Sequence, residues 1–267
     1  MNSLSIVGVG LIGGSFALAL REAGFTGRII GVSSQPAIDA ALARGVINEA
    51  LPLGRAAAVS DFIYLAQPIE RILQTIDVID AHARPGALIT DAGSTKVAIV
   101  NRAAASIHRA RFVGGHPMAG KESRGVEQAE ADLFRGRPYV LTSRDAELES
   151  WIERIGARLV VMTAEEHDRL VAVTSHLPQL ISTALASVIG ATPDAAKVAG
   201  PAAVDLTRLA LSPYEIWRDI FATNADSVDA AVGAFIAKLE ELRATLRSPE
   251  MERAFGDAAA SAKALRR

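Results

Sequence analysis

The chain has 267 residues, of which half are apolar and 22% are charged, and its formal net charge is -2. This composition excludes a disordered chain, and the length allows one large domain or two modest ones. The absence of cysteine excludes disulfides and thiolate chemistry. The balanced charge gives no electrostatic footprint for nucleic acid, and no apolar run is expected to reach the roughly 18 residues that span a bilayer. Because the first expected strand begins close to the N-terminus, no signal peptide is expected, and we predict a cytoplasmic protein without a membrane partner.

The first half of the chain alternates between expected strands and helices. An apolar, β-branched strand over 3–9 is followed by a glycine-rich turn and a helix over 11–23. Further strands are expected over 28–32, 61–66, 87–91, 112–115, 139–142 and 158–163, with helices over 36–45, 68–82 and 95–107. This alternation predicts an α/β fold with a parallel, doubly wound sheet of the Rossmann type.

The second half is expected to contain only helices, over 164–189, 194–209, 213–245 and 249–265. We therefore place a domain boundary at residue 163, between a dinucleotide-binding domain over 1–163 and a helical domain over 164–267. Pro178 cannot donate to the carbonyl of Thr174, so the first of these helices should kink there. Polar residues beside the kink predict a lined cavity.

The glycines after the first strand follow the spacing G-x-G-x-x-G between a strand and a helix, the context in which that motif binds dinucleotides. Gly8 permits a tight turn, Gly10 lets the backbone approach a pyrophosphate, and Gly13 lets the helix pack on the strand. The alternative is a glycine-rich turn without a ligand. The residues expected to contact the cofactor are Gly8, Gly10, Leu11, Ile12, Gly13, Ser33, Ser34, Gln67 and Pro68.

The end of the second strand bears on the choice of cofactor. An acidic residue there would bind the ribose 2′-hydroxyl of NAD, but this strand runs into Ser33 and Ser34. Hydroxyls can donate to a 2′-phosphate, whereas a carboxylate would repel it. The sequence leans toward NADP for this reason, although no arginine is present at the turn to pair with the phosphate.

Two polar residues follow later strands, at the edge of the sheet where such folds bind ligands. Ser94 could contact a nicotinamide or a substrate hydroxyl, or it could be the N-cap of the next helix. His116 is held between glycines and a proline, and it can accept a proton from an alcohol as hydride leaves the same carbon. The alternative for His116 is a loop histidine that only bonds backbone.

The helical half contributes further candidates. His176 lies near the expected kink, either as a core histidine or in a cavity, and a regular helix would point it away from His167. The two are therefore not expected to share a metal, and no metal site is predicted. His82, His108 and His167 are expected at the surface or at helix ends. Arg208, in an apolar neighbourhood, is expected to be buried and to pair with Asp205 or with a substrate carboxylate.

Five stretches of the chain together resemble the prephenate/arogenate dehydrogenase family of tyrosine biosynthesis. They are GVGLIGGS (8–15), DAGSTK (91–96), GGHPMAGKESRGVE (114–127), HDRLVAVTSHLPQ (167–179) and DLTRLALSPYEIWRDIFATN (205–224). The resemblance covers essentially the whole chain. It implies oxidative decarboxylation of prephenate to 4-hydroxyphenylpyruvate, or of arogenate to tyrosine, with hydride transfer to NAD or NADP.

The resemblance also implies roles for individual residues. Ser94 and His116 would contact the ring 4-hydroxyl, with His116 accepting its proton, and Arg208 would bind the ring carboxylate. His176 would hold the substrate at the domain interface, and Glu122 would join a gating ionic network with Asp205. Lys121 would add charge near the pocket, and Gln179 and Glu122 are candidates for distinguishing the keto from the amino side chain. The helical domain would form a homodimer.

Two other functions stay open from the sequence. A β-hydroxyacid dehydrogenase of similar plan would need a catalytic lysine in the first helix of the second domain, but Lys197 lies beyond that helix. A non-catalytic module that senses NADP would bind the cofactor without turnover. Because the chain ends soon after its last expected helix, we expect no regulatory domain, and any inhibition by tyrosine would have to act at the active site.

Overall fold

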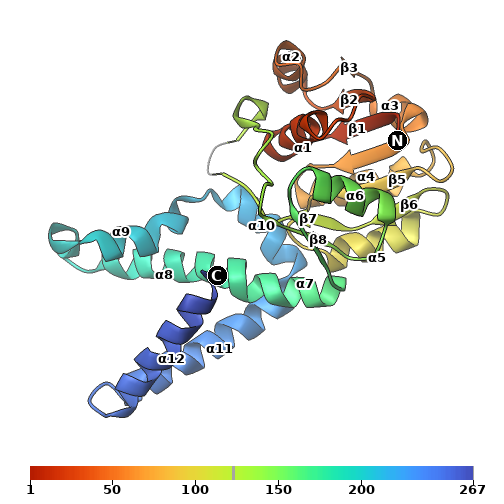
Figure 1. Ribbon diagram of the computed structural model, residues 1–267. Coiled ribbons are helices and arrows are strands. Elements are labelled where there is room, and N and C mark those ends of the chain that lie inside the picture. Colours follow the sequence, from red (N-terminus) through yellow and green to blue (C-terminus); the bar gives the residue numbers. More distant parts are fainter. Residues whose placement is uncertain (122–123, 267) are drawn as a thin grey trace.

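The computed structural model describes residues 1–121 and 124–266, which form an α/β half and a helical half (Figure 1). The main sheet has six parallel strands in the order β3-β2-β1-β4-β5-β6. Their bounds are β1 Ser3–Val7, β2 Arg28–Val32, β3 Glu49–Ala50, β4 Phe62–Leu65, β5 Leu88–Asp91 and β6 Arg111–Val113. The strand order reverses between β1 and β4, and the crevice beyond the carboxyl ends of these two strands is where such sheets bind ligands. The predicted doubly wound fold is confirmed.

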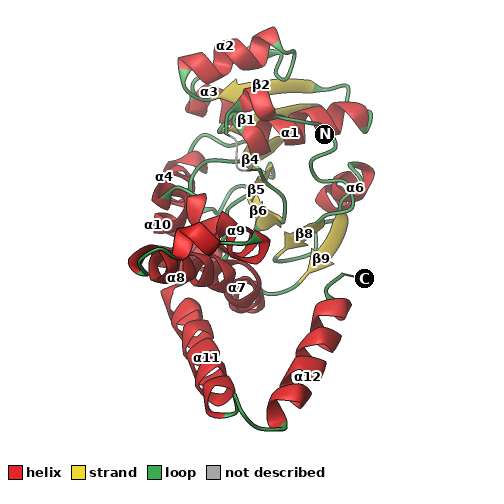
Figure 2. Ribbon diagram, turned by 90° about the vertical axis from the view of Figure 1, so that its left-hand side faces the viewer, coloured by secondary structure: helices red, strands yellow, loops and turns green. Residues whose placement is uncertain are grey.

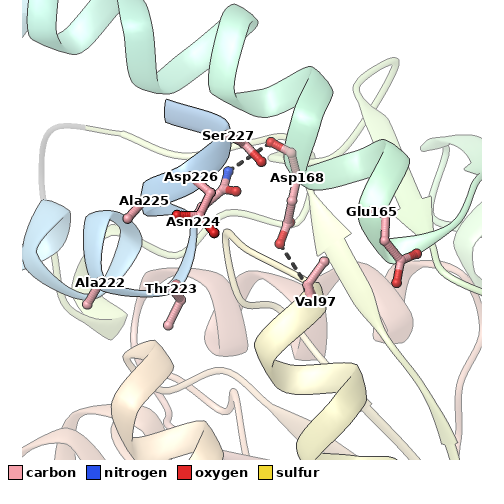
Figure 3. A pocket seen from close by; sticks show the side chains of 9 residues that line it. All are labelled: Val97, Glu165, Asp168, Ala222, Thr223, Asn224, Ala225, Asp226 and Ser227. Carbon is pink, nitrogen blue, oxygen red and sulfur yellow. Dashed lines mark hydrogen bonds between the residues drawn. The ribbon is translucent and has the colours of Figure 1, made fainter. Parts of the chain in front are cut away.

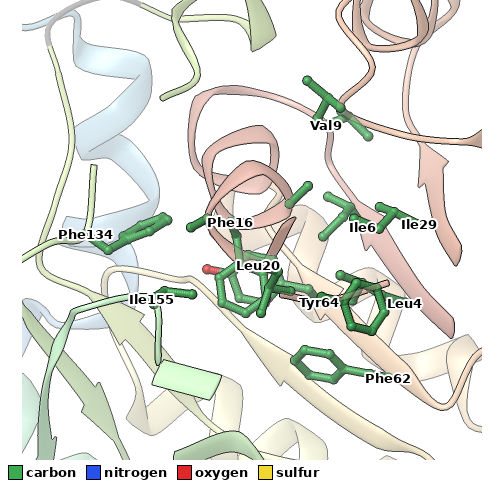
Figure 4. Close-up of a cluster of buried hydrophobic side chains, with 14 of the residues drawn as sticks. Leu4, Ile6, Val9, Phe16, Leu20, Ile29, Phe62, Tyr64, Phe134 and Ile155 are labelled. Carbon is green, nitrogen blue, oxygen red and sulfur yellow. The ribbon is translucent and has the colours of Figure 1, made fainter. Parts of the chain in front are cut away.

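Five helices cover the two faces of this sheet: α1 Leu11–Glu22, α2 Gln35–Ala43, α3 Leu53–Val59, α4 Ile69–Ile79 and α5 Val97–Ser106. Successive strand residues point to opposite faces. Leu4 and Ile6 of β1 accordingly join Phe16 of α1 in one buried cluster (Figure 4), while Val7 joins Ile72 of α4 in another. The two clusters fix the carboxyl ends of the strands, and the loops that carry the candidate residues start there.

The predicted strand over 112–115 is divided between two sheets. β6 ends at Val113, and β7 (Gly115–Pro117) pairs antiparallel with β8 (Pro138–Leu141), which is parallel to β9 (Arg158–Val161). Our expectation that all these strands extend one parallel sheet is therefore wrong. The chain leaves the main sheet at Gly114, whose N–H donates to the hydroxyl of Thr142 and whose C=O accepts from the N–H of Thr142. α6 (Ala146–Arg154) lies between β8 and β9 in the chain.

The other corrections to the α/β half are small. β3 and α3 were not expected, because two residues of strand and seven residues of an alanine-rich helix give no measurable periodicity. α6 was not expected either, and the remaining strands and helices of this half lie within a few residues of their expected bounds.

The helical half begins with one long run whose middle is a π-helical turn, Ala172–His176, between α7 (Ala164–Val171) and α8 (Leu177–Ala191). A π-helical turn closes i→i+5 bonds, so it adds a residue to the helical register and changes the direction of every later side chain. It takes the place of the simple kink expected at Pro178. α9 (Pro201–Thr207), α10 (Tyr214–Thr223), α11 (Ala225–Ala244) and α12 (Glu250–Ala264) follow, and α11 and α12 extend away from the sheets (Figure 2).

One feature of the helical half corrects the expectation about apolar runs. The helical run 164–191 is long and apolar enough to cross a membrane by length and composition alone. Only 22% of its most apolar window is buried in the single chain. Its inner side nevertheless packs within the protein, since His167, His176 and Gln179 are all buried.

Candidate functional site

The glycine-rich turn after β1 leaves an open space at the start of α1. Gly8 has φ +97°, and a Cβ on it would lie 2.5 Å from the carbonyl oxygen of Ala66. A Cβ on Gly13 would lie 2.3 Å from the carbonyl oxygen of Gly8, so α1 packs closely on the turn. Around Gly10, the N-cap of α1, a Cβ would meet nothing within 4 Å. Free N–H groups of α1 thus face a space in which an anion can lie against the backbone.

A groove of about 520 Å³ runs between this turn and the helical half. On the α/β side it is lined by Ile12, Gln67, Pro68 and Ser94, and α10 supplies the opposite wall. Leu11 is the half-buried first residue of α1 beside it. The structure therefore brings together most of the predicted cofactor positions and Ser94, although their role as cofactor contacts stays a prediction.

Ser33 and Ser34 lie at the carboxyl end of β2, where both are exposed. Ser34 is the N-cap of α2, but its hydroxyl does not bond the helix backbone. The side chains at this position are therefore available to a ligand.

Ser94 is half-buried on the loop between β5 and α5. It is not the N-cap of α5, since that position belongs to Lys96, so the capping alternative for Ser94 is wrong. The neighbouring Thr95 hydroxyl lies 2.7 Å from the hydroxyl of Thr223 on α10, which joins this loop to the helical half. The hydroxyl of Ser94 bonds no residue within 1–121 or 124–266 and remains available at the groove.

His116 is the middle residue of β7, where its Nδ1 lies 2.8 Å from Nε2 of His167. Burial lowers the pKa of His116 well below its ordinary value, and the charges of His167 and Lys96 lower it further. The imidazole is therefore neutral near pH 7, the form that can accept a proton. A loop histidine bonded only to backbone is excluded.

His167 was expected at the surface or at a helix end. It is the fourth residue of α7 and is 1% exposed, so the expectation of a surface residue is wrong. Its Nδ1 lies 2.7 Å from Oδ1 of Asp168. Both residues belong to the buried stripe of α7, with Ala164 and Val171 at helical spacing. This periodicity was the sequence signal that could have found them.

A buried ion pair bonds the backbone of Gly115, the residue before His116, and the sequence analysis did not single it out. Lys96 and Asp91 are both fully buried and pair with each other. Lys96 Nζ also donates to the carbonyl of Gly115 at 2.6 Å, and the N–H of Gly115 donates to Asp91 at 3.1 Å. Burial lowers the pKa of the Lys96 ammonium, and the charge of Asp91 opposes that effect. The pair therefore fixes the backbone directly before His116.

His176 is buried at the end of the π-helical turn. Its Nδ1 lies 3.4 Å from Nδ2 of Asn224, and its ring packs edge-on against Trp217. Burial lowers the pKa of His176 to about 4. The helical geometry expected to separate His176 from His167 does not hold across the π-helical turn, and the charges of both rings lower the pKa of His116.

Three predicted substrate residues line a second cavity of about 370 Å³: Lys121, Gln179 and Arg208. Lys121 pairs with Glu130 at 2.5 Å, and the buried Oε1 of Gln179 has no hydrogen-bond partner among residues 1–121 and 124–266. Arg208 is exposed in the single chain, so the expectation that it is buried is wrong. The predicted partner Asp205 is also exposed, and Glu122 lies outside the described residues.

A third pocket is lined by Asp168 and lies between α7 and the start of α11 (Figure 3). Asn224 donates to the backbone carbonyl of Asp168 at 2.8 Å, and the carboxylate of Asp168 accepts from the N–H of Val97 at 2.9 Å. Asp168 thus joins the helical half to the start of α5. Within the described ranges, no group of three His, Asp or Glu residues has the geometry to hold a metal ion.

Two domain families match the chain in succession. Residues 16–165 match the family described as prephenate dehydrogenase, nucleotide-binding domain, and residues 163–256 match prephenate dehydrogenase, dimerization domain. The prephenate dehydrogenase of Lactococcus lactis subsp. cremoris is 33% identical over 252 residues, which are 91% of this chain and 70% of that protein.

Solved structures are similar over almost the whole chain. Prephenate dehydrogenase from A. aeolicus, in complex with hydroxyphenyl propionate and NAD+, has a TM-score of 0.92 at 31% identity, covering 99% of this chain and 98% of that one. Synechocystis arogenate dehydrogenase has a TM-score of 0.86 at 30% identity, covering 98% and 99%. Because the nucleotide-binding match alone spans more than half of the sequence, this chain belongs to the prephenate dehydrogenase family.

Proposed function

We propose that the protein catalyses the oxidative decarboxylation of prephenate or arogenate, using NAD(P)+ as the hydride acceptor. The observation that carries this proposal is a neutral, buried imidazole at His116 whose preceding residue, Gly115, is bonded by Lys96, at the end of the loop that carries Ser94 into the groove. The similarity to prephenate and arogenate dehydrogenases supports the same reaction.

The residues around the groove fit a dinucleotide. The open space at Gly10 and the N-terminus of α1 suit the pyrophosphate, because free N–H groups there attract an anion. Ile12, Gln67 and Pro68 line the path from that turn toward Ser94, where the nicotinamide end would lie. When bound, the nicotinamide supplies the site that accepts hydride.

The protein's own groups would act at the substrate. Ser94 and His116 bind the hydroxyl on C4 of the ring, and His116 accepts its proton as hydride leaves that carbon. The proton becomes strongly acidic as the C–O bond gains carbonyl character, so a histidine with a lowered pKa is a sufficient base. The dienone that results loses the C1 carboxylate as CO2, because decarboxylation makes the ring aromatic. Arg208 orients that carboxylate beforehand.

Replacing Arg208 by alanine should raise KM for the cyclohexadienyl substrate about ten- to hundredfold, with a smaller effect on kcat. A charge-assisted contact of this kind contributes roughly 1.5–3 kcal/mol to binding, and tight binding in the transition state would oppose CO2 release. Steady-state kinetics measure both constants. Arg55→Ala, on an exposed position of α3, is the control, and an unchanged KM in Arg208→Ala would remove Arg208 from the substrate site.

We propose NADP+ as the preferred form of the cofactor. The hydroxyls of Ser33 and Ser34 are exposed at the end of β2, where a carboxylate would repel the 2′-phosphate. Ser33→Asp should therefore raise the Kd of NADP+ about tenfold or more and leave the Kd of NAD+ unchanged or lower. Titration of the protein with each dinucleotide measures both values. Equal affinities in the original protein, or no selective loss in the variant, would contradict the preference.

We further propose that residues 1–163 act as the dinucleotide-binding domain and residues 164–267 as a dimerisation domain of a homodimer. The match of residues 163–256 to a dimerization domain supports this assignment. Exposed apolar side chains on the helical half, such as Val188, Leu211 and Phe255, also support it, since a second copy can cover them. We assign the apolar surface of 164–191 to that interface rather than to a membrane, and a cytoplasmic location stays a prediction.

The alternatives have less support. A β-hydroxyacid dehydrogenase would need a lysine at the active site, but Lys197 is exposed and pairs with Asp194. A non-catalytic NADP sensor would give no reason for a buried, neutral histidine at position 116. One assay separates these functions: prephenate and arogenate are each tested with NAD+ and NADP+, and the reduced cofactor is followed by absorbance. Reduction with at least one cyclohexadienyl acid is expected, and reduction with none would overturn the proposal.

A further inference from the structure

We infer that His167 and Asp168 are positioning residues that hold His116 in the tautomer whose Nε2 is free to accept a proton. The three side chains form a continuous chain, with 2.7 Å between Asp168 Oδ1 and His167 Nδ1 and 2.8 Å between His167 Nε2 and His116 Nδ1. This inference rests on the proposed function only because that function supplies the proton that the free Nε2 of His116 would accept.

With both rings neutral, the donors and acceptors of the chain permit one arrangement. An ionised carboxylate can only accept, so the proton of neutral His167 lies on Nδ1, next to Asp168. Nε2 of His167 then carries a lone pair and accepts from Nδ1–H of His116. The remaining ring nitrogen of His116, Nε2, has no proton. A base that removes a proton from a substrate hydroxyl needs this form.

Backbone donors fix the side chain of Asp168 as a hydrogen-bond acceptor. It is 2% exposed and accepts from the N–H groups of Lys96 at 2.7 Å and Val97 at 2.9 Å. These N–H groups begin α5, whose positive end favours a carboxylate. The same carboxylate therefore fixes the end of the loop that carries Ser94, and it connects the serine and the histidine of the candidate site.

Charged groups from three elements face the imidazole of His116. His167 and Asp168 approach from α7, His176 approaches from the π-helical turn, and Lys96 approaches from the loop before α5, paired with Asp91. Among the residues that the structure describes, His167 is the hydrogen-bond partner of the His116 ring. His167 therefore determines which ring nitrogen of His116 carries the proton.

Asp168→Asn tests the inference with almost no change of shape. The amide nitrogen can donate to Nδ1 of His167 only from the position of Oδ1, where it would face the N–H of Lys96; the amide oxygen, in the position of Oδ2, would still accept from Val97. The proton of each imidazole would then lie on the opposite ring nitrogen, so His116 would carry its proton on Nε2. We expect kcat to fall about a hundredfold, with the Kd of the cofactor unchanged. Glu165→Gln, an exposed position on the same helix, is the matched control for the loss of charge.

Nitrogen-15 NMR of the histidine rings reads the tautomer directly and needs no substrate. The signals of His116 are identified by their loss in His116→Asn. We expect Nδ1–H in the original protein and Nε2–H in Asp168→Asn. Unchanged kcat in folded Asp168→Asn, or an Nε2–H tautomer in the original protein, would overturn the inference. If Asp168→Asn does not fold, the spectrum of the original protein still decides, and it does so even if the protein lacks dehydrogenase activity.

Discussion

Replacing His116 by asparagine should lower kcat by about a hundredfold or more and leave the affinity for the cofactor unchanged. General bases contribute on the order of 10²–10⁴ to a rate, and the asparagine amide has no comparable basicity. Its side chain can still bond His167, so the buried surroundings remain occupied. Single-turnover kinetics with saturating cofactor, together with a cofactor titration, measure the two quantities.

The control for this substitution is His82→Asn, because His82 is an exposed histidine of the same half of the protein. It should leave kcat within about twofold of the original value. Full activity in His116→Asn would mean that another group, or water, removes the hydroxyl proton. A loss of cofactor binding would instead mean that His116 supports the groove.

Lys96→Met should lower the free energy of unfolding by about 3–5 kcal/mol. Both charges of the Lys96–Asp91 pair are fully buried, and removing one partner leaves the other without compensation. The substitution also removes the hydrogen bond to the carbonyl of Gly115, directly before His116. Urea denaturation followed by circular dichroism measures the loss of stability.

The double variant Lys96→Met/Asp91→Asn separates the uncompensated charge from the loss of packing. It should recover a large part of the lost stability, since removing both charges costs far less than removing one. Asparagine can still accept from the N–H of Gly93, which donates to Asp91 at 2.7 Å. If the single variant loses less than about 1 kcal/mol, the pair does not control the stability of this region.

Much of the α/β half could be predicted from the sequence, because local chemistry determines it. The conformation of Gly8, the open space at Gly10 and the close packing at Gly13 follow from the absence of a side chain at each position. The buried strands are short apolar runs ended by turns, and such runs need little tertiary information. The bounds of β2 agree with the predicted range 28–32.

The split between two sheets could not be predicted, because it depends on contacts across the chain. Gly114 leaves the main sheet where Thr142, almost thirty residues later, bonds both its N–H and its C=O. A continuous apolar segment such as 112–115 gives no sign of this change. His116 was nevertheless singled out by its flanking glycines and proline, although it lies in strand β7 and not in a loop.

The relation between His167 and His176 was missed for a different reason. The sequence analysis took 164–189 as one helix kinked near Pro178 and used the regular helical spacing to place His167 and His176 on opposite faces. The π-helical turn changes the register between them, and hydrogen bonds alone determine such a turn. The burial of His167 and Asp168 was still readable from their spacing with Ala164 and Val171.

Arg208 was chosen as a candidate site residue for a reason that fails. It was selected as a buried arginine in need of an anion, and it is exposed in the single chain. It still lines a cavity with Lys121 and Gln179. The apolar residues around Arg208 in the sequence predicted that it is buried. The prediction failed because such a pattern does not distinguish the core of one chain from a surface that a second copy can cover.

The most direct test of the account is a crystal structure of the protein with oxidised cofactor and a 4-hydroxyphenyl carboxylate that resembles the product. The account predicts that the phenolic oxygen lies within hydrogen-bond distance of Nε2 of His116 and of the Ser94 hydroxyl. It also predicts that the nicotinamide occupies the groove beside Ser94. An imidazole turned away from the phenolic oxygen, or a phenol bound outside this groove, would contradict it.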